Sequence, residues 1–278
     1  MALLATVVSV AVGVGAYAVF NPHRAAKLHV VWSSEFSRGN FTGWSWWGQT
    51  QQSIWGHIAV VRPRAVGVPS RFGPYVARFQ TTEADLAHAR YNAKLYKYFD
   101  TVAGQGERPP RTVSGTYSAW YYLPHSFSMQ PAKWINMFQF KDMYRLPDGS
   151  SYSLPLWWVQ IGRASWAKAY PGASWTTGKP AHDDAPVIFL NHWNNRWTRQ
   201  VVFAAAPRGR WFEISADVHQ GDRIDFYLDG HKFDTARAND YPVSPFRPHS
   251  EAWIFGVGDY GNDPAGPIYI ARASYSTS

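Results

Sequence analysis

The sequence contains no cysteine, so it can form neither disulfide bonds nor metal sites built on thiolates. Its ten histidines show neither the His-x-His nor the His-Glu-x-x-His spacing of metal-binding motifs. The chain also has no internal repeat at a fixed period and no low-complexity linker. These absences exclude a disulfide-stapled scaffold and a repeat protein, and they leave one domain as the expectation for 278 residues.

Long stretches with apolar residues three and four positions apart are also missing. The segment TEADLAHARYNAKL comes nearest, but its helical face would carry Leu86, Ala89 and Ala93, and alanine is too small to anchor a core. We therefore interpret this segment as a turn followed by a strand. Period-two alternation with Gly, Pro and Asx punctuation elsewhere predicts an all-β protein made of two packed antiparallel sheets.

Acidic residues are scarce relative to basic ones. The chain has 27 Lys and Arg against 19 Asp and Glu, which gives a formal net charge of +8 and a pI near 9.6. An anionic partner is therefore expected. Because the basic residues are scattered, and 15 Trp, 16 Tyr and 16 Phe suit sugar stacking as well as a β core, we expect an acidic polysaccharide and no nucleic acid.

The only long uncharged apolar run is at the N-terminus. Ala2 to Phe20 has no charged side chain, and Ala16-Tyr17-Ala18 has the small-x-small form of a signal-peptidase site. Residues 1–28 are therefore predicted to be a signal peptide, which would make the protein secreted or extracellular. The run is also long enough for an uncleaved membrane anchor, because about 20 apolar residues span a bilayer. The membrane would be a partner only in that case.

The last third of the chain predicts consecutive antiparallel strands. Trp211 to Val218 is followed by Arg223 to Leu228, which ends at Asp229-Gly230, a dipeptide suited to a type I′ hairpin turn. Two further strands are expected at Glu251 to Gly256 and Ile268 to Tyr275. Earlier strands are expected at Tyr75 to Thr81, at Arg90 to Phe99, in GTYSAWYYLP up to Pro124, at Trp134 to Asp142 and in LPLWWVQIG.

This order of motifs resembles the concanavalin A-like jelly-roll sandwich, and within it the heparin-lyase-like polysaccharide lyase group. A Gly-x-Trp strand, a strand ending in Asp-Gly and a late Gly-x-Tyr segment occur in that order. The resemblance extends from about Glu35 to Tyr275, and so makes residues 29–278 one jelly-roll domain. It implies an exported enzyme that cleaves a uronic acid polysaccharide by β-elimination.

The resemblance also carries candidate site residues. The lyase group has Arg-x-Glu, Gln-x-His and a late tyrosine, which supply a carboxylate neutraliser, a base and an acid. Here Arg90 matches, but Asn92 replaces the Glu. Gln139 matches, but Lys141 replaces the His, and Tyr260 matches the late tyrosine. The two replacements favour an alternative function, a non-catalytic carbohydrate-binding or cell-surface module on the same fold.

Strand alternation extends this set. In WINMFQFKD it places Gln139 and Lys141 on one face with Ile135 and Met137, and it places Trp134, Asn136, Phe138 and Phe140 on the other. The same rule predicts a substrate-binding strip that joins Gln139 and Lys141 to Arg90, Asn92, Lys94, Trp158 and Gln160. A solvated strand face is the alternative interpretation of its basic residues.

His192 is the best candidate base among the histidines, because it follows an apolar strand and has Asn191 and Asn194 as neighbours that could orient its ring. A surface histidine at a strand end is the alternative. The predicted catalytic residues are therefore Gln139, Lys141, His192 and Tyr260. A retaining glucanase is disfavoured, since it needs two carboxylates about 5 Å apart and no Glu-x-Asp-x-x-Glu strand is present.

No metal or cofactor is expected. The concanavalin A-like sandwiches that this chain resembles often hold Ca²⁺ between an acidic residue near the first strand and an Asp in the last strand. In this chain Glu35 fits the first position, but Arg272 stands at the second, where a positive charge would repel Ca²⁺. We predict that Glu35 and Arg272 pair instead, with a contribution of at most about 1 kcal/mol. The protein is expected to be a monomer.

Overall fold

The computed structural model describes residues 28–45, 57–82, 92–100, 113–145, 148–192, 202–220, 222–237, 250–261 and 264–278. Strands dominate these residues, and their helical segments are η1 (Pro63–Val66) and α3 (Ala164–Lys168). The all-β prediction is confirmed. The N-terminal segment 1–27 and residues 83–91, which include the turn expected before Arg90, lie outside the described residues. Within the described residues, no helix is long and apolar enough to cross a membrane.

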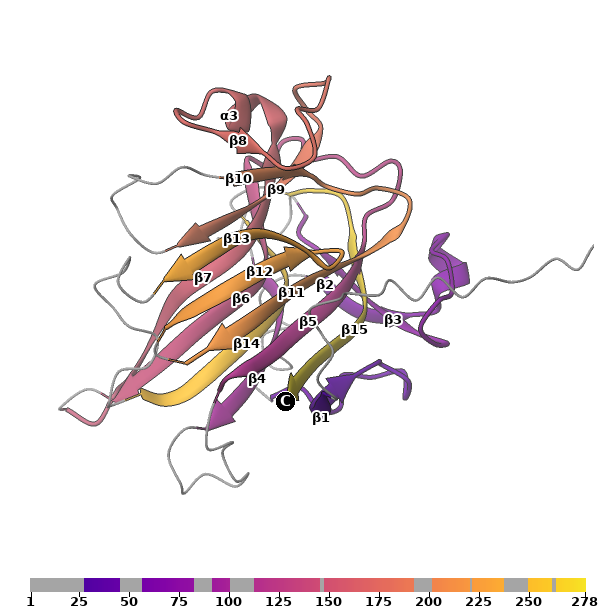
Figure 1. Cartoon of the computed structure of the whole chain (residues 1–278). Helices are drawn as coiled ribbons and strands as arrows, with labels where there is room; N and C mark the ends of the chain where they lie inside the picture. Colours follow the sequence, from indigo (N-terminus) through magenta and orange to yellow (C-terminus); the bar gives the residue numbers. More distant parts are fainter. Residues whose placement is uncertain are drawn as a thin grey trace, which may run out of the picture.

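One sheet of the sandwich has eight strands (Figure 1). Its spatial order is β13 (His231–Arg237), β12 (Arg223–Leu228), β11 (Trp211–His219), β5 (Gly115–Tyr122), β15 (Ile268–Thr277), β3 (Val76–Gln80) and β2 (His57–Val61), with β1 (His29–Ser34) also paired to β15. All of these pairings are antiparallel. The last strand therefore lies beside the first, and β1 lies next to the C-terminus in Figure 1.

The second sheet has seven strands. Its order is β4 (Asn92–Asp100), β14 (Ser250–Gly261), β6 (Trp134–Arg145), β7 (Ser151–Arg163), β9 (Pro186–His192), β10 (Val202–Ala205) and β8 (Ser174–Trp175). The pairing is antiparallel except for the short contact between β10 and β8. That contact joins only two residues of each strand.

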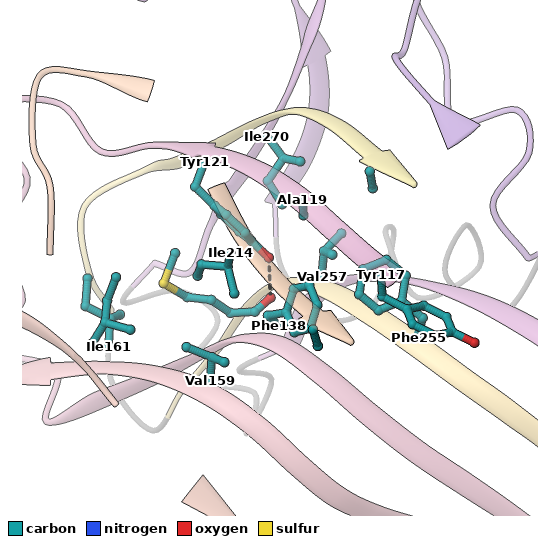
Figure 2. Close-up of a cluster of buried hydrophobic side chains, with 14 of the residues drawn as sticks. Tyr117, Ala119, Tyr121, Phe138, Val159, Ile161, Ile214, Phe255, Val257 and Ile270 are labelled. Atoms are coloured by element: carbon teal, nitrogen blue, oxygen red, sulfur yellow. Dashed lines mark hydrogen bonds between the residues drawn. The ribbon is translucent and has the colours of Figure 1, made fainter. Parts of the chain in front are cut away.

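The two sheets pack face to face through alternate residues of their strands. Ala119, Tyr121, Ile214 and Ile270 from the eight-stranded sheet meet Phe138, Val159, Ile161, Phe255 and Val257 from the other (Figure 2). The Tyr121 hydroxyl crosses the interface and donates to the Met137 carbonyl at 3.1 Å. A buried hydroxyl needs such a partner, and burial raises the pKa of Tyr121. The concanavalin A-like sandwich is therefore the part of the family resemblance that the structure confirms.

The predicted hairpin after β12 is present. Leu228 pairs with His231, so Asp229 and Gly230 form a two-residue loop. Their φ angles are 49° and 78°, and positive φ at both positions is what a type I′ turn requires. The Asp229 side chain also accepts from the Glu213 backbone N–H at 2.9 Å, which ties the turn to β11.

Glu35 and Arg272 lie together, as predicted. Arg272 Nε is 3.4 Å from Glu35 Oε1, and both side chains are partly exposed. The pair connects the segment after β1 to β15 at the position where a calcium ion was considered. Because an exposed ion pair of this kind is screened by water, its contribution to stability stays at about 1 kcal/mol or less.

Gly258 allows β4 and β14 to approach closely. Its φ is +139°, and a Cβ atom there would overlap the Ala93 carbonyl oxygen and lie 2.9 Å from Lys94 Cα. We expect Gly258→Ala to lower the free energy of unfolding by about 2 to 4 kcal/mol, measured by denaturant titration. Gly67→Ala is the control, because Gly67 has φ +70° with nothing within 4 Å of its Cβ position. It should lose only about 1 kcal/mol, and equal losses would contradict the close-approach argument.

Candidate functional site

Polar and aromatic side chains line the outer face of the seven-stranded sheet, the face turned away from the core. Their strand neighbours Ala93, Leu95, Phe138, Phe140, Trp157, Val159, Leu190 and Val257 belong to the core, so alternation turns these side chains outward. We call them the outer strip and define it as Lys94 and Tyr96 on β4, Tyr260 on β14, Trp134, Asn136, Gln139 and Lys141 on β6, Trp158 and Gln160 on β7, and Asn191 on β9.

Strand register places these residues in rows across the sheet. One row runs from Tyr96 through Gly256, Gln139 and Trp158 to Asn191. A second row joins Tyr260 to Asn136 and Asn136 to Gln160. Residues paired in this way have Cβ atoms about 5 Å apart. The outer strip is therefore continuous over β4, β14, β6, β7 and β9.

Beyond the outer strip, the same face of the sheet is covered. Val187 and Phe189 on β9 and Phe203 on β10 pack with Ala164 and Ala167 of α3 in a separate apolar cluster. In Figure 1, α3 and β8 lie together at one end of the sandwich, above β10. Among the described residues, α3 therefore covers the β9–β10 part of this face, and the outer strip lies to the other side, on β9, β7, β6, β14 and β4.

Lys94 is the central charged group of the outer strip. It is fully buried, and its Nζ donates to Gln139 Oε1 at 2.8 Å. The same Nζ lies 5.4 Å from the centre of the Tyr260 ring, while Tyr260 itself is 40% exposed. A buried amine thus lies directly behind an exposed tyrosine, in contact with an amide.

Burial lowers the pKa of Lys94 well below its usual value, because the charged form loses its hydration. The nearby charge of Lys141 lowers it further, and the carboxylate of Asp259 opposes both effects. Asp259 is itself fully buried and accepts from the Thr81 backbone N–H at 2.9 Å and the Thr81 hydroxyl at 3.1 Å. Lys94 therefore has a larger neutral fraction than an exposed lysine, and a neutral amine can accept a proton.

Lys141 lies over the ring of Tyr96. Its Nζ is 4.6 Å from the centre of the Tyr96 ring, a cation–π contact. The Tyr96 ring in turn covers Gly256, since a Cβ at Gly256 would lie 2.7 Å from it. Lys141 is only half-buried, so its charge stays available to an anion on the surface.

The structure brings together six of the predicted site residues. Gln139, Lys141, Tyr260, Lys94, Trp158 and Gln160 all lie on the outer strip. Arg90 lies outside the described residues. Asn92 pairs with Tyr260 through its backbone, and His192 ends β9 opposite Trp157. The side chains of Asn92 and His192 are outside the described part, so their roles stay predictions.

The predicted faces of β6 were wrong in their first half. Ile135 and Met137 lie in the core, while Trp134 and Asn136 share the outer face with Gln139 and Lys141. The reason is a β-bulge: the register shifts between Asn136 and Phe138, so β6 has one residue more than β7 at this point. The adjacent apolar pair Met137-Phe138 was the only sequence signal for it.

Sequence reasoning therefore missed four members of the strip. Trp134 and Asn136 were assigned to the other face, while Tyr96 and Asn191 were not included in the binding set. Asn191 Nδ2 donates to Gln160 Oε1 at 2.8 Å. The ring centres of Trp134 and Tyr260 are 5.9 Å apart. These residues add an amide pair and an aromatic pair to the predicted basic strip.

Among the described side chains, no group of three or more histidine, cysteine or acidic residues is placed to hold a metal ion. The residues that define the outer strip also include no carboxylate. Their chemistry is that of two amines, amides, indoles and phenols. Such a set can bind an anion, stack a sugar ring and move a proton.

No protein family and no curated protein sequence matches the chain. Among solved structures, a carbohydrate esterase from the Shiga toxin-encoding bacteriophage phi24B is 11% identical and covers 91% of this chain and 100% of its own, with a TM-score of 0.46. A laminarinase from Flavobacterium sp. UMI-01 is 12% identical, and the match covers 90% of this chain and 100% of the laminarinase, with a TM-score of 0.41. The catalytic domain of an endo-1,3-beta-glucanase from Thermotoga petrophila RKU-1 is 11% identical, and the match covers 91% of this chain and 98% of that domain, with a TM-score of 0.38.

These three structures are described as an esterase and glucanases, and none as a heparin lyase. The resemblance to the lyase group therefore stays a prediction. At such identities and TM-scores, the function of this chain has to be argued from the side chains of the outer strip.

Proposed function

We propose that the outer strip binds an acidic, uronic acid polysaccharide and that the protein cleaves it by β-elimination. The observation that carries the proposal is the position of Lys94 Nζ, which is 2.8 Å from Gln139 Oε1 and 5.4 Å from the centre of the exposed Tyr260 ring. A proton acceptor, a polar amide and a phenol are thereby held on one face of the sheet, and the charge of Lys141 acts on Lys94.

The first requirement of the reaction is to stabilise negative charge at the substrate carboxylate. Lys141 supplies a positive charge next to Lys94, and the Gln139 amide supplies N–H donors. In a partly buried site such groups stabilise the enolate-like charge that develops when the α-proton leaves. The net charge of +8 favours the approach of the anionic chain.

The second requirement is a pair of proton transfers. Neutral Lys94 takes the proton from C5 of the uronic acid, the C5–H electrons form the C4=C5 double bond, and the bond from C4 to the glycosidic oxygen breaks. The Tyr260 hydroxyl protonates the leaving oxygen. Lys94 is then an ammonium and Tyr260 a phenolate, and transfer of one proton between them restores both groups.

Hydrolysis by a retaining glycosidase mechanism fits the outer strip less well. That reaction uses two carboxylates about 5 Å apart, whereas the side chains that define the strip contain none. The buried carboxylate of Asp259 acts on Lys94, but it is bonded to Thr81.

The second candidate function is a carbohydrate-binding module without catalysis. The observation that favours it is the aromatic pair Trp134 and Tyr260, with ring centres 5.9 Å apart, beside the amides of Asn136 and Gln160. Aromatic faces and amides are sufficient to hold a sugar chain. In that case Lys94 and Lys141 would serve only as positive charges for the acidic groups.

The experiment that separates these functions uses chain 29–278 with alginate, polygalacturonate and hyaluronan. Lyase activity is measured as ultraviolet absorbance of the unsaturated product, and binding is measured at low and high salt. Salt-dependent binding with new unsaturated ends supports the lyase. Salt-dependent binding without unsaturated ends leaves the binding module, and no binding to any acidic polymer rejects both functions.

Export of the protein is part of the same proposal, because large polysaccharides are found outside cells. The uncharged run from Ala2 to Phe20 and the Ala16-Tyr17-Ala18 site support it. N-terminal sequencing of the protein recovered from an expressing culture tests the idea. A start after Ala18 in the medium indicates a cleaved signal peptide, an intact N-terminus in membranes indicates an anchor, and an intact N-terminus in the cytosol contradicts export.

A further inference from the structure

Two buried polar atoms of the outer strip have no hydrogen-bond partner. They are Oδ1 of Asn136 and Nε1 of Trp158. The Asn136 side chain is only 2% exposed. Their polar neighbours are paired, because Lys94 donates to Gln139 and Asn191 donates to Gln160. The two unpaired atoms are therefore exceptions within a surface whose other amides are satisfied.

An unpaired buried polar atom lowers stability, because it has lost water without gaining a partner. Most buried polar atoms in folded proteins are paired for this reason, and an exception needs an explanation. Asn136 and Trp158 lie on adjacent strands. Asn136 pairs with Gln160 and Trp158 pairs with Gln139, so the two side chains are diagonal neighbours on one face. Diagonal neighbours are about 7 to 8 Å apart, a span that one bound molecule such as a sugar chain covers.

The chemistry of the two atoms restricts what that molecule can be. Asn136 Oδ1 only accepts a hydrogen bond, and the Trp158 indole N–H only donates one. A carboxylate could satisfy the tryptophan but not the asparagine, and an ammonium could satisfy the asparagine but not the tryptophan. A hydroxyl group donates and accepts, so one hydroxyl or two neighbouring hydroxyls satisfy both.

We infer that Asn136 and Trp158 form a subsite for the ring hydroxyls of a sugar. Tyr260 is the cross-strand partner of Asn136 and is 40% exposed, so the proposed subsite borders an exposed part of the outer strip. The inference rests on one part of the proposed function, namely that the outer strip binds a polysaccharide. It adds that hydroxyls are recognised on β6 and β7, beside a carboxylate held by Lys141 and Gln139.

The test compares Asn136→Leu and Trp158→Phe with the wild-type protein. Leucine is close to asparagine in shape and removes the unpaired acceptor, while phenylalanine keeps an aromatic ring and removes the indole N–H. If the two groups serve a ligand, Asn136→Leu does not lower the melting temperature of the free protein, because no bond is lost. Trp158→Phe also removes ring volume, so it is judged by binding alone. Each should weaken polysaccharide binding about tenfold, the usual loss for one hydrogen bond.

A matched control and a matched probe sharpen the test. Ser118 lies on β5 of the other sheet and bonds to Ser274 at 3.0 Å, so Ser118→Ala should leave binding unchanged. The probe pair is polygalacturonate with free ring hydroxyls and the same polymer with its hydroxyls acetylated. Acetylation should weaken wild-type binding about tenfold and should have little further effect on Asn136→Leu.

The outcomes distinguish this inference from the proposed function. Wild-type affinity in both variants, or a lowered melting temperature of free Asn136→Leu, overturns the hydroxyl subsite and leaves the proposed function standing. Binding that depends on Asn136 and on free hydroxyls, without unsaturated product, supports the subsite and rejects the lyase. If the wild type binds no polymer in a panel that includes alginate, polygalacturonate and neutral laminarin, both ideas are rejected.

Discussion

Replacement of Tyr260 by phenylalanine is expected to lower the formation of unsaturated ends by about 100- to 10,000-fold, the contribution of a well-placed general acid. Binding should remain within a few-fold of wild type, because the ring that lies 5.9 Å from Trp134 and covers Lys94 is retained. A change confined to kcat would show that the hydroxyl acts in the transition state. The measurement is steady-state absorbance on the best polymer of the panel, with binding measured separately.

Tyr96→Phe is the matched control for this variant. Tyr96 is also a tyrosine of the outer strip, but its ring packs over Gly256 and beneath the Lys141 amine. Loss of its hydroxyl should leave the rate within a few-fold of wild type. Equal rates for Tyr260→Phe and wild type would remove Tyr260 from the reaction, and equal losses in both variants would point to a general disturbance of the surface.

The parts of the fold that sequence predicted correctly depend on local rules. The Asp229-Gly230 turn was predictable because few dipeptides accept positive φ at both positions. The strand β5 was predictable because its alternation is regular, and it places Tyr117, Ala119 and Tyr121 in the core. The pairing of Glu35 with Arg272 followed from opposite charges at two positions that the resembling sandwiches bring together.

The parts that were missed depend on how distant strands meet. The bulge at Met137 is defined only by the register of β6 against β7, and no property of residues 134–142 alone determines that register. It moved Trp134 and Asn136 to the outer face, which doubled the polar and aromatic contribution of β6. The burial of Lys94 likewise depends on Gln139 and Tyr260, which lie far from it in sequence.

Lys94 is consequently the residue whose role changed most. Sequence indicated a solvated or substrate-binding lysine, whereas the structure shows a fully buried amine with a lowered pKa. In the proposed reaction it is the proton acceptor. We expect Lys94→Met to lower product formation by about 100- to 10,000-fold, while Lys97→Met has little effect. Lys97 is buried on the same strand with the opposite parity, and its Nζ lies 5.9 Å from the Phe99 ring.

The pH dependence of the rate separates a proton acceptor from a positive charge. If neutral Lys94 is the base, the wild-type rate rises with pH through the lowered pKa of Lys94 and levels off above it. Lys141 and Asp259 are the charged groups that set this pKa, in opposite directions. Lys141→Met should therefore move the rise to higher pH. A rate that falls over the same range would mean that Lys94 acts as an ammonium, and it would reject the base assignment.

The same pKa predicts a stability effect that does not depend on activity. Between the lowered pKa of folded Lys94 and the unfolded value near 10.5, the unfolded chain binds a proton that the folded protein does not. Stability therefore rises with pH across this window, by about 1.4 kcal/mol per pH unit at most. Stability levels off above the unfolded pKa. Below the folded pKa, Lys94 is charged in both states and the cost of burying that charge is fully present.

Denaturant titrations of wild type and Lys94→Met as a function of pH should show this slope only in the wild type. Parallel curves would mean that Lys94 is charged in the folded protein, and the amine could not then serve as the base.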